Sequence, residues 1–329
     1  MKNSEEYEAR LDVAAAHRLA VMHGLNEGVW NHISLCSPHQ PENILISPGH
    51  THWGQVKASN LALMSPEGKM ISGERPPIRA GWIIHHPVHT ARPDAKCVIH
   101  VHAPYTTAMS IRKDMKFETR SSQQSAGFHD DVVYYEVYDG VLEDESEGVH
   151  MAEVLGDKRI LMMRNHGAMI VGETVARAYL DAYQLERACM YQLLAVAGGG
   201  EMQLIPEEVA AEMGHLARKG RNIEHFEGIV REELDLRMEI SAAAEFAENT
   251  KSDRNFYVPK VMWSLSGKRV ITTEWVEGMA VGDIERIKKS GVDIESFAKR
   301  IIKTFLTQAL RDGFFHGDMH QGNLKCRSD

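Results

Sequence analysis

The sequence has no excess of basic residues and no long hydrophobic run. Of its 329 residues, 37 are lysine or arginine and 46 are aspartate or glutamate, which gives a formal net charge of −9. An acidic chain offers no electrostatic footprint for a nucleic acid. No apolar run approaches the roughly 18 residues of a membrane-spanning helix, and the charged segment 1–19 does not resemble a secretion signal. We therefore expect a cytoplasmic protein with no nucleic-acid partner and no membrane insertion.

Cysteine is scarce, and its spacing forms no motif. The chain has four cysteines, and no two of them stand in a CxxC pattern. A disulfide framework or a zinc ribbon needs closer and repeated spacing. We therefore expect free thiols at Cys36, Cys97, Cys189 and Cys326.

The composition is that of an ordinary globular protein, with 43% hydrophobic and 25% charged residues. A single core rarely grows beyond about 250–300 residues, so this length allows two domains. The clearest boundary is the triple glycine at 198–200, which ends a long helical pattern. We expect a metal-binding domain over 1–200, a helical linker over 201–228 and a second segment over 229–329.

The first domain alternates helical and strand patterns. Apolar residues at helical spacing predict helices, and short apolar runs between turn residues predict strands. In the last segment we expect a helix, a hairpin-like pair and two more helices. The predicted helices of the first domain cover 7–28, 80–91, 174–196 and a stretch from 104. The predicted strands lie within 31–38 and 43–49 and cover 62–64, 97–102, 132–137 and 160–163.

Two histidines share the strand CVIHVH, at positions 100 and 102. Side chains alternate across a strand, so His100 and His102 project from the same face, close enough to share one ion. A third candidate ligand is His166, which follows an apolar strand ending at Asn165 and precedes Gly167, where the backbone can turn tightly. Three imidazoles with an open coordination position suit a catalytic first-row metal ion.

These motifs resemble those of a known family. RPDAKCVIHVHAPYTTAMS and, further on, LMMRNHGAMIVG are similar to segments of the class II aldolase and adducin family, and the likeness runs from about 8 to 197. The resemblance implies that His100, His102 and His166 hold a divalent metal. We expect Zn²⁺, with Mn²⁺ and Fe²⁺ as alternatives. It also implies an α/β fold, a three-layer α/β/α sandwich around a mainly antiparallel sheet, and a homotetramer with sites at its subunit interfaces.

The resemblance breaks at the expected acid/base. The family's aldolases carry a carboxylate four residues before a helix histidine, and here that histidine is His85 while the carboxylate position is Gly81. The segment AGWIIHHPVHTARPDA is more similar to the adducin branch, which also lacks the carboxylate. His85 is therefore a candidate fourth ligand or substitute base, and a packed residue beside the site is the alternative.

The resemblance also marks substrate-binding positions. The family's phosphate-binding pairs correspond here to segments that keep few of their residues, which makes a small hydroxy or oxo acid as good a substrate as a sugar phosphate. The candidate binding residues are Asn31, Ser47 and Gly49. Tyr135 and Tyr138 lie where the family brings a residue toward a neighbouring subunit's site, and we take Tyr135 as a candidate catalytic residue, with core packing as the alternative.

The segment 229–329 resembles a second family, the atypical kinases associated with ubiquinone biosynthesis. Asp318 and Asn323 have the spacing of a kinase catalytic loop, and Glu233 or Glu239 is the candidate helix carboxylate. The strands that would cover a nucleotide are absent upstream, so we expect a fusion remnant without kinase activity. The matching motifs are REELDLRMEISAAAEF, VPKVMWSLSGKRVITTEWVEG and ALRDGFFHGDMHQGN.

Three functions compete for the first domain. The first is a metal-dependent aldolase-type lyase acting on a small-molecule substrate. The second is an adducin-like binding module without catalysis, favoured by the glycine at position 81. The third is a non-haem iron oxygenase that uses the same three histidines.

Overall fold

The chain divides into two compact units, Met1–Val230 and Arg231–Asp329. The computed structural model describes residues 4–113, 116–138, 140, 144–199, 201–220, 236–253, 255–267, 270–313 and 324–327.

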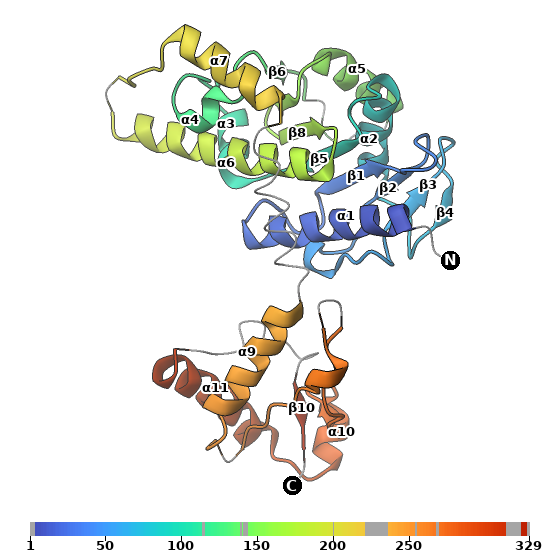
Figure 1. The fold of residues 1–329 in the computed structure, drawn as a ribbon, viewed down its shortest axis with the longest axis vertical. Coiled ribbons are helices and arrows are strands. Elements are labelled where there is room, and N and C mark those ends of the chain that lie inside the picture. The colour runs from blue at the N-terminus through green and yellow to red at the C-terminus, as the bar shows by residue number, and fades with distance from the viewer. Residues whose placement is uncertain are drawn as a thin grey trace. The chain divides into compact units, whose positions relative to one another are not determined.

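An eight-stranded sheet forms the centre of the first unit (Figure 1). The strand order is β4-β3-β2-β1-β5-β8-β7-β6, and every neighbouring pair is antiparallel except β6 and β7. This confirms the predicted mainly antiparallel sheet. The strands are β1 (His32–Cys36), β2 (Ile44–Ile46), β3 (Ala62–Met64), β4 (Met70–Ser72), β5 (Cys97–Val101), β6 (Val132–Tyr135), β7 (Ile160–Met163) and β8 (Gly167–Gly172).

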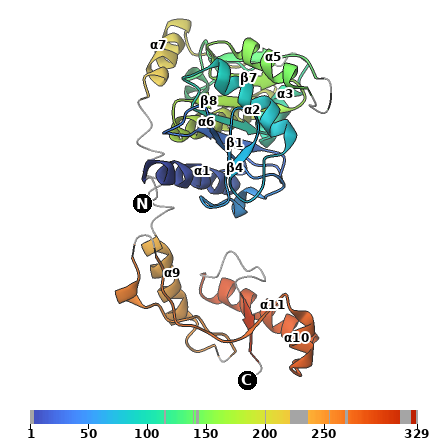
Figure 2. The same cartoon turned by 90° about the vertical axis from the view of Figure 1, so that its right-hand side faces the viewer.

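Helices cover both faces of this sheet and complete three layers, as the two views in Figures 1 and 2 show. On one side α1, α3 and α6 pack on β1, β5 and β8, and on the other side α2 and α5 pack on each other and on β1, β5, β6 and β7. The helices are α1 (Ser4–Met22), α2 (Arg79–Ala91), α3 (Pro104–Ser110), α4 (Gln123–Ala126), α5 (Glu145–Leu155), α6 (Val175–Ala197) and α7 (Glu207–Arg218), with a 3-10 turn, η1, at Trp53–Gln55.

The apolar core beneath α2 and α5 sets the direction of the site residues. Val98 of β5 and Met169 of β8 are buried there against Ile84 of α2. Side chains alternate along a strand, so His100, two residues after Val98 and paired with Met169, faces the same helices. His32 of β1 is the register partner of His100 on the other side. The sheet therefore presents two neighbouring histidines to α2.

The segment expected to act as a helical linker contains α7, which packs on α4. Its Gly214 lies against His129, so close that a Cβ would be 2.9 Å from the His129 carbonyl oxygen. At the end of the helix, the Nε atom of Arg218 is 3.0 Å from Oδ2 of the buried Asp131. These contacts attach α7 to the first unit.

The second unit is mostly helical in its described residues. The short strands β9 and β10 pair antiparallel. Met279, Ile287 and Cys326 form a small buried cluster. Where a hairpin-like pair is expected, the described residues form the isolated bridges Val261↔Thr273 and Gly267↔Val270. Its elements are α9 (Leu236–Asn249), η2 (Trp263–Leu265), β9 (Met279–Ala280), α10 (Ile284–Lys289), α11 (Ile294–Arg311) and β10 (Lys325–Cys326).

Two expectations from composition bear on the described residues. None of their helices is long and apolar enough to cross a bilayer. All four cysteines are free thiols, as predicted.

Candidate metal centre

Three histidines meet at one end of β5. His100 lies within the strand, His102 just after it, and His166 in the tight turn between β7 and β8. Asn165, with φ 55°, and Gly167, with φ 146°, turn the chain there. A Cβ at Gly167 would collide with the carbonyl oxygen of Val101. Glycine therefore allows this turn to lie directly against β5, which brings His166 to the other two histidines.

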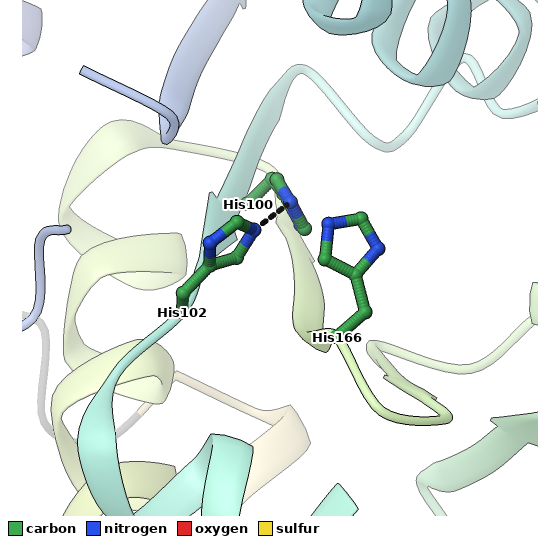
Figure 3. Close-up of side chains that lie close together, drawn as sticks. All are labelled: His100, His102 and His166. Atoms are coloured by element: carbon green, nitrogen blue, oxygen red, sulfur yellow. Dashed lines mark hydrogen bonds between the residues drawn. The ribbon is translucent and has the colours of Figure 1, made fainter. Parts of the chain in front are cut away.

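The three imidazoles point toward one another, as Figure 3 shows. One nitrogen from each ring can be chosen so that all three lie within 4.8 Å of one another. The Nε2 atoms of His100 and His102 are 2.9 Å apart, and the ring centroid of His166 is 4.8 Å from that of His100. Among the described residues this is the one group of histidine, cysteine, aspartate and glutamate side chains arranged to hold a metal ion.

The other ring nitrogens of His100 and His102 are already used. Nδ1 of His100 donates to the carbonyl oxygen of Ala168 at 3.1 Å, and Nδ1 of His102 lies 2.7 Å from Oε2 of Glu27. Donation through Nδ1 leaves a lone pair on each Nε2, the tautomer that a metal-binding histidine requires. Two lone pairs then face each other at short range. A divalent ion fits between them after a small adjustment, because two nitrogen ligands of tetrahedral Zn²⁺ lie about 3.3 Å apart.

Burial keeps the imidazoles of His100 and His166 neutral. It lowers the pKa of His100 well below 6.5, with further lowering from the neighbouring His166 and His102. Burial, followed by the charge that His102 can carry, lowers the pKa of His166 to about 4. Neutral imidazole is the form that binds metal. His100 and His166 therefore have the protonation state of metal ligands, and all three side chains have the direction and spacing of a metal site.

Glu27 belongs to this site, and the sequence analysis did not identify it. It lies in the loop between α1 and β1, and its backbone N–H donates to Oδ1 of Asn31. The loop meets His102 only because β1 pairs with β5. An acidic residue shortly before the strand that pairs with a histidine-rich strand is the signal that could have found it.

His85 lies on α2, fully buried, in a chain of hydrogen bonds. Nδ1 of His89 lies 2.7 Å from the carbonyl oxygen of Ala95, so it donates there and its Nε2 accepts from the Ser34 hydroxyl at 2.7 Å. The Ser34 oxygen then accepts from Nδ1 of His85 at 2.5 Å. Nε2 of His85 is left as a bare acceptor, and it is buried without a partner among the described residues.

His32, which the sequence patterns do not single out, is the other histidine close to the three ligands. Its ring stacks on that of His100 with centroids 5.8 Å apart, and it meets His85 edge-on at 5.7 Å. Burial first, and then His102, His166 and His17, lower its pKa to about 3. Its ring fills the space next to Gly81, where a Cβ would be 2.9 Å from the His32 Cδ2 atom. No side chain fits at position 81 while His32 keeps this place.

The three predicted substrate-binding residues differ in what they offer. Asn31 is buried, and its Nδ2 donor has no partner among the described residues. The hydroxyl of Ser47 is engaged with Nε2 of His17 at 2.7 Å and with the backbone of Ile33. The N–H of Gly49 donates to the carbonyl oxygen of Pro76. Only Asn31 keeps a free hydrogen-bonding atom.

The two tyrosines, Tyr135 and Tyr138, lie close to His166. Tyr135 is buried at the end of β6, with its ring 5.4 Å from that of His150, whereas Tyr138 is exposed and its ring is 6.3 Å from that of His166. Both line a small cavity with Arg164 and His166. The ring of Tyr138 thus lies beside one of the three candidate metal ligands.

The predicted kinase-like residues fall mostly outside the described part of the second unit. Asp318, Asn323 and Glu233 lie outside the described residues, so the roles assigned to them stay predictions. Glu239 lies exposed on α9.

Comparison with known proteins gives two family matches. The model of the Class II Aldolase and Adducin N-terminal domain matches residues 11–193, more than half of the chain. The model of the ABC1 atypical kinase-like domain matches residues 204–329. Both resemblances predicted from the sequence are confirmed.

Solved structures and one sequence relative extend the first match. An aldolase II superfamily protein from Pseudomonas syringae is 30% identical with a TM-score of 0.65, and the match covers 70% of this chain and 93% of that one. L-fuculose 1-phosphate aldolase from Glaciozyma antarctica is 27% identical with a TM-score of 0.61, covering 69% and 90%. Alpha-adducin of Mus musculus is 34% identical over 195 residues, which are 58% of this chain and 26% of alpha-adducin. The predicted α/β fold is thereby confirmed.

Proposed function

The chain belongs to the class II aldolase and adducin family, and from that premise we propose that it is a divalent-metal-dependent aldolase-type lyase acting on a small hydroxy or oxo substrate. The observation that carries this proposal is the convergence of His100, His102 and His166, with the Nδ1 atoms of two of them already fixed by hydrogen bonds. Packing alone does not require three imidazoles to face one another. An ion-binding site accounts for the arrangement.

The donor set favours Zn²⁺, with Mn²⁺ and Fe²⁺ as alternatives, because three nitrogen ligands suit a first-row metal ion with an open position. His100, His102 and His166 would hold it. When bound, a divalent ion polarises a carbonyl or hydroxyl oxygen of the substrate and stabilises the negative charge that develops there.

Two groups hold His102 and His100 in place. The Glu27 carboxylate accepts from Nδ1 of His102, and the Ala168 carbonyl accepts from Nδ1 of His100. These bonds fix the ring orientations and leave Nε2 of each ring without a proton. The backbone N–H of Glu27 also holds Oδ1 of Asn31, which directs the free Nδ2 donor of Asn31 as a candidate contact for a substrate oxygen.

In this proposal His85 is a hydrogen-bond acceptor for the substrate. The Ser34 hydroxyl fixes its tautomer, so the unprotonated atom is Nε2. Burial, followed by His32 and His89, lowers its pKa well below 6.5, which makes the ring a weak base and keeps Nε2 unprotonated and able to accept from a substrate O–H. Because position 81 is a glycine and His85 is a weak base, the metal site would provide most of the polarisation of the substrate.

The test is turnover by metal-loaded protein. We would incubate the Zn²⁺, Mn²⁺ and Fe²⁺ forms with small hydroxy and oxo acids and measure the carbonyl products of aldol cleavage and decarboxylation. Native protein should form product, and His166→Ala should not. The matched control is His39→Ala, which removes an imidazole whose one ion-pair partner in the described part of the chain is the surface residue Glu5. No turnover by any metal-loaded form would contradict the lyase proposal.

A second candidate function is an adducin-like binding module. The observation that favours it is the absence of a carboxylate at position 81, where the His32 ring fills the space. A protein that holds its metal and turns over none of these substrates would support this module over the lyase.

The homotetramer stays a prediction, and the exposed Tyr138 is the residue that we propose to reach toward a neighbouring subunit. Light scattering on protein eluting from a size-exclusion column measures the mass of the assembly directly. A mass of four chains would support the proposal, and a monomer would contradict it.

A further inference from the structure

A second group of polar atoms faces the three-histidine cluster from its α2 side. His32 is the register partner of His100, and both rings are on the face of the sheet that α2 covers. On α2, Gly81 and His85 are four residues apart and so lie on one side of the helix, toward β1. The His32 ring lies between these elements, 5.8 Å from the His100 centroid and 5.7 Å from the His85 centroid.

Three buried nitrogens in this group have no partner among the described residues. They are Nδ1 and Nε2 of His32 and Nε2 of His85. Buried polar atoms are nearly always hydrogen-bonded, because an unpaired one loses its contact with water and gains nothing in return. A histidine that packs for structural reasons pairs its nitrogens, as His17 does with the Val13 carbonyl and Ser47 hydroxyl. His32 is equally enclosed and pairs neither.

The position of the His32 ring also requires an unfavourable residue in α2. Glycine in a helix is less favourable than alanine, yet Gly81 is the third residue of α2. A Cβ there would be 2.9 Å from Cδ2 and 3.1 Å from Nε2 of His32. The helix thus accepts glycine at the one point where the imidazole needs the space. Unpaired buried nitrogens and a helix glycine each lower stability, and such unfavourable features gathered at one place are typical of a functional site.

We propose that His32 is a substrate-binding residue of the three-histidine site and that one of its ring nitrogens, with Nε2 of His85, binds an oxygen-bearing group of the substrate. The inference rests on the proposed lyase function. A neutral imidazole carries one donor and one acceptor nitrogen. His32 can therefore donate to an oxo oxygen, while Nε2 of His85 accepts from a hydroxyl. A substrate with adjacent hydroxyl and oxo groups satisfies both.

The first test needs no ligand. In metal-free full-length protein, His32→Leu removes two unpaired nitrogens and keeps similar volume, so its urea unfolding midpoint should equal or exceed the native one. The matched control is His17→Leu, which breaks two hydrogen bonds of an equally buried ring and should lower the midpoint. If His32→Leu lowers the midpoint as much as His17→Leu does, the ring is structural and the inference is wrong.

The second test uses glycolohydroxamate, a small analogue with adjacent hydroxyl and oxo-type oxygens, titrated calorimetrically into Zn²⁺-loaded protein. We expect His32→Leu to retain the native metal content and to bind the probe at least tenfold more weakly. Equal binding by His32→Leu and native protein would overturn the inference. Native protein that lacks metal or fails to bind the probe counts against the proposed lyase, and the unfolding comparison then decides the role of His32.

Discussion

The Nδ1 atom of His102 lies 2.7 Å from the Oε2 atom of Glu27, 75 residues earlier in the chain. The carboxylate is mostly solvent-exposed, with 61% of the Glu27 side chain accessible, while the His102 side chain is 14% accessible. An exposed carboxylate gains little from an ion pair. Its value at this position is to orient the ring, because a fixed Nδ1–H directs the Nε2 lone pair toward the other two histidines.

Replacing Glu27 should therefore weaken metal binding without unfolding the protein. Glu27→Ala leaves the three ligands in place, and loss of such an orienting partner typically costs about 10–100-fold in metal affinity. Competition against a chelator of known affinity measures this change. Glu153→Ala is the matched control, because Glu153 is an exposed carboxylate paired with the non-ligand His150. Equal affinities of native protein and Glu27→Ala would refute the orienting role.

Acid should destabilise the metal-free protein at pH values well above those at which ordinary carboxylates titrate. Burial lowers the pKa of His17 and of His89 to about 4, from 6.5 in the unfolded chain. A lowered folded-state pKa means that the unfolded chain binds the proton more tightly, so this stability is present above pH 6.5 and is lost as the pH falls toward 4. Each ring accounts for about 3 kcal/mol over that window.

Urea unfolding from pH 7.5 to 4.5 checks this expectation. His17→Gln removes one of the titrating groups, so its stability should fall less steeply with acid, by up to about 1.4 kcal/mol per pH unit. The variant is less stable at pH 7.5, which makes the slope the informative quantity. Parallel slopes for native protein and variant would show that His17 does not titrate in this way.

A buried ion network beneath α6 should carry much of the stability of the first unit. Arg159 lies 2.6 Å from Asp131 and 2.5 Å from Asp181, and both carboxylates are almost fully buried. Arg159→Met leaves these charges only partly compensated, which should cost about 3–5 kcal/mol of unfolding free energy. Lys158→Met, which breaks an adjacent exposed pair with Asp157, should change stability by no more than about 1 kcal/mol. Similar effects from the two variants would contradict this view of the network.

The contact between α2 and His32 predicts an unusual effect of alanine. Gly→Ala inside a helix normally stabilises by about 0.5–1 kcal/mol. Gly81→Ala should instead destabilise the protein, because the added Cβ would meet the His32 ring at 2.9 Å.

A double-mutant cycle tests this contact. In the His32→Ala background the ring is gone, so Gly81→Ala should recover the ordinary helical gain. Gly198→Ala, where the nearest atom is 3.7 Å from the added Cβ, should be tolerated in both backgrounds. Additive effects of the substitutions at positions 81 and 32 would mean that the two residues do not compete for space.

The elements with simple periodicity were predictable from the sequence. Short apolar runs mark β3 and β7 at the bounds that the structure has, and the helical pattern of α6 ends at the glycines. The pattern does not mark α5, whose interior contains Gly148. That glycine is needed because a Cβ there would collide with the Ile83 carbonyl of α2. Tertiary packing thus removed the local helical signal.

The candidate site was predictable where one strand carries it. Alternation along β5 places His100 and His102 on one face. The end of an apolar strand and the glycine after it marked His166 as a candidate, and the family resemblance implied its role as a ligand. Glu27 and His32 were not predictable, because they reach the site through the pairing of β1 with β5. Strand partners and register are long-range choices that a local pattern does not encode.

Metal content is the most direct test of the three-histidine site. Elemental analysis of native protein purified without added metal should find about one Zn²⁺, Mn²⁺ or Fe²⁺ per chain, as the three-ligand site requires. His102→Ala should lose that metal, and His39→Ala should keep it. Native protein that holds no metal even after reconstitution would contradict the metal centre and the lyase proposed on it.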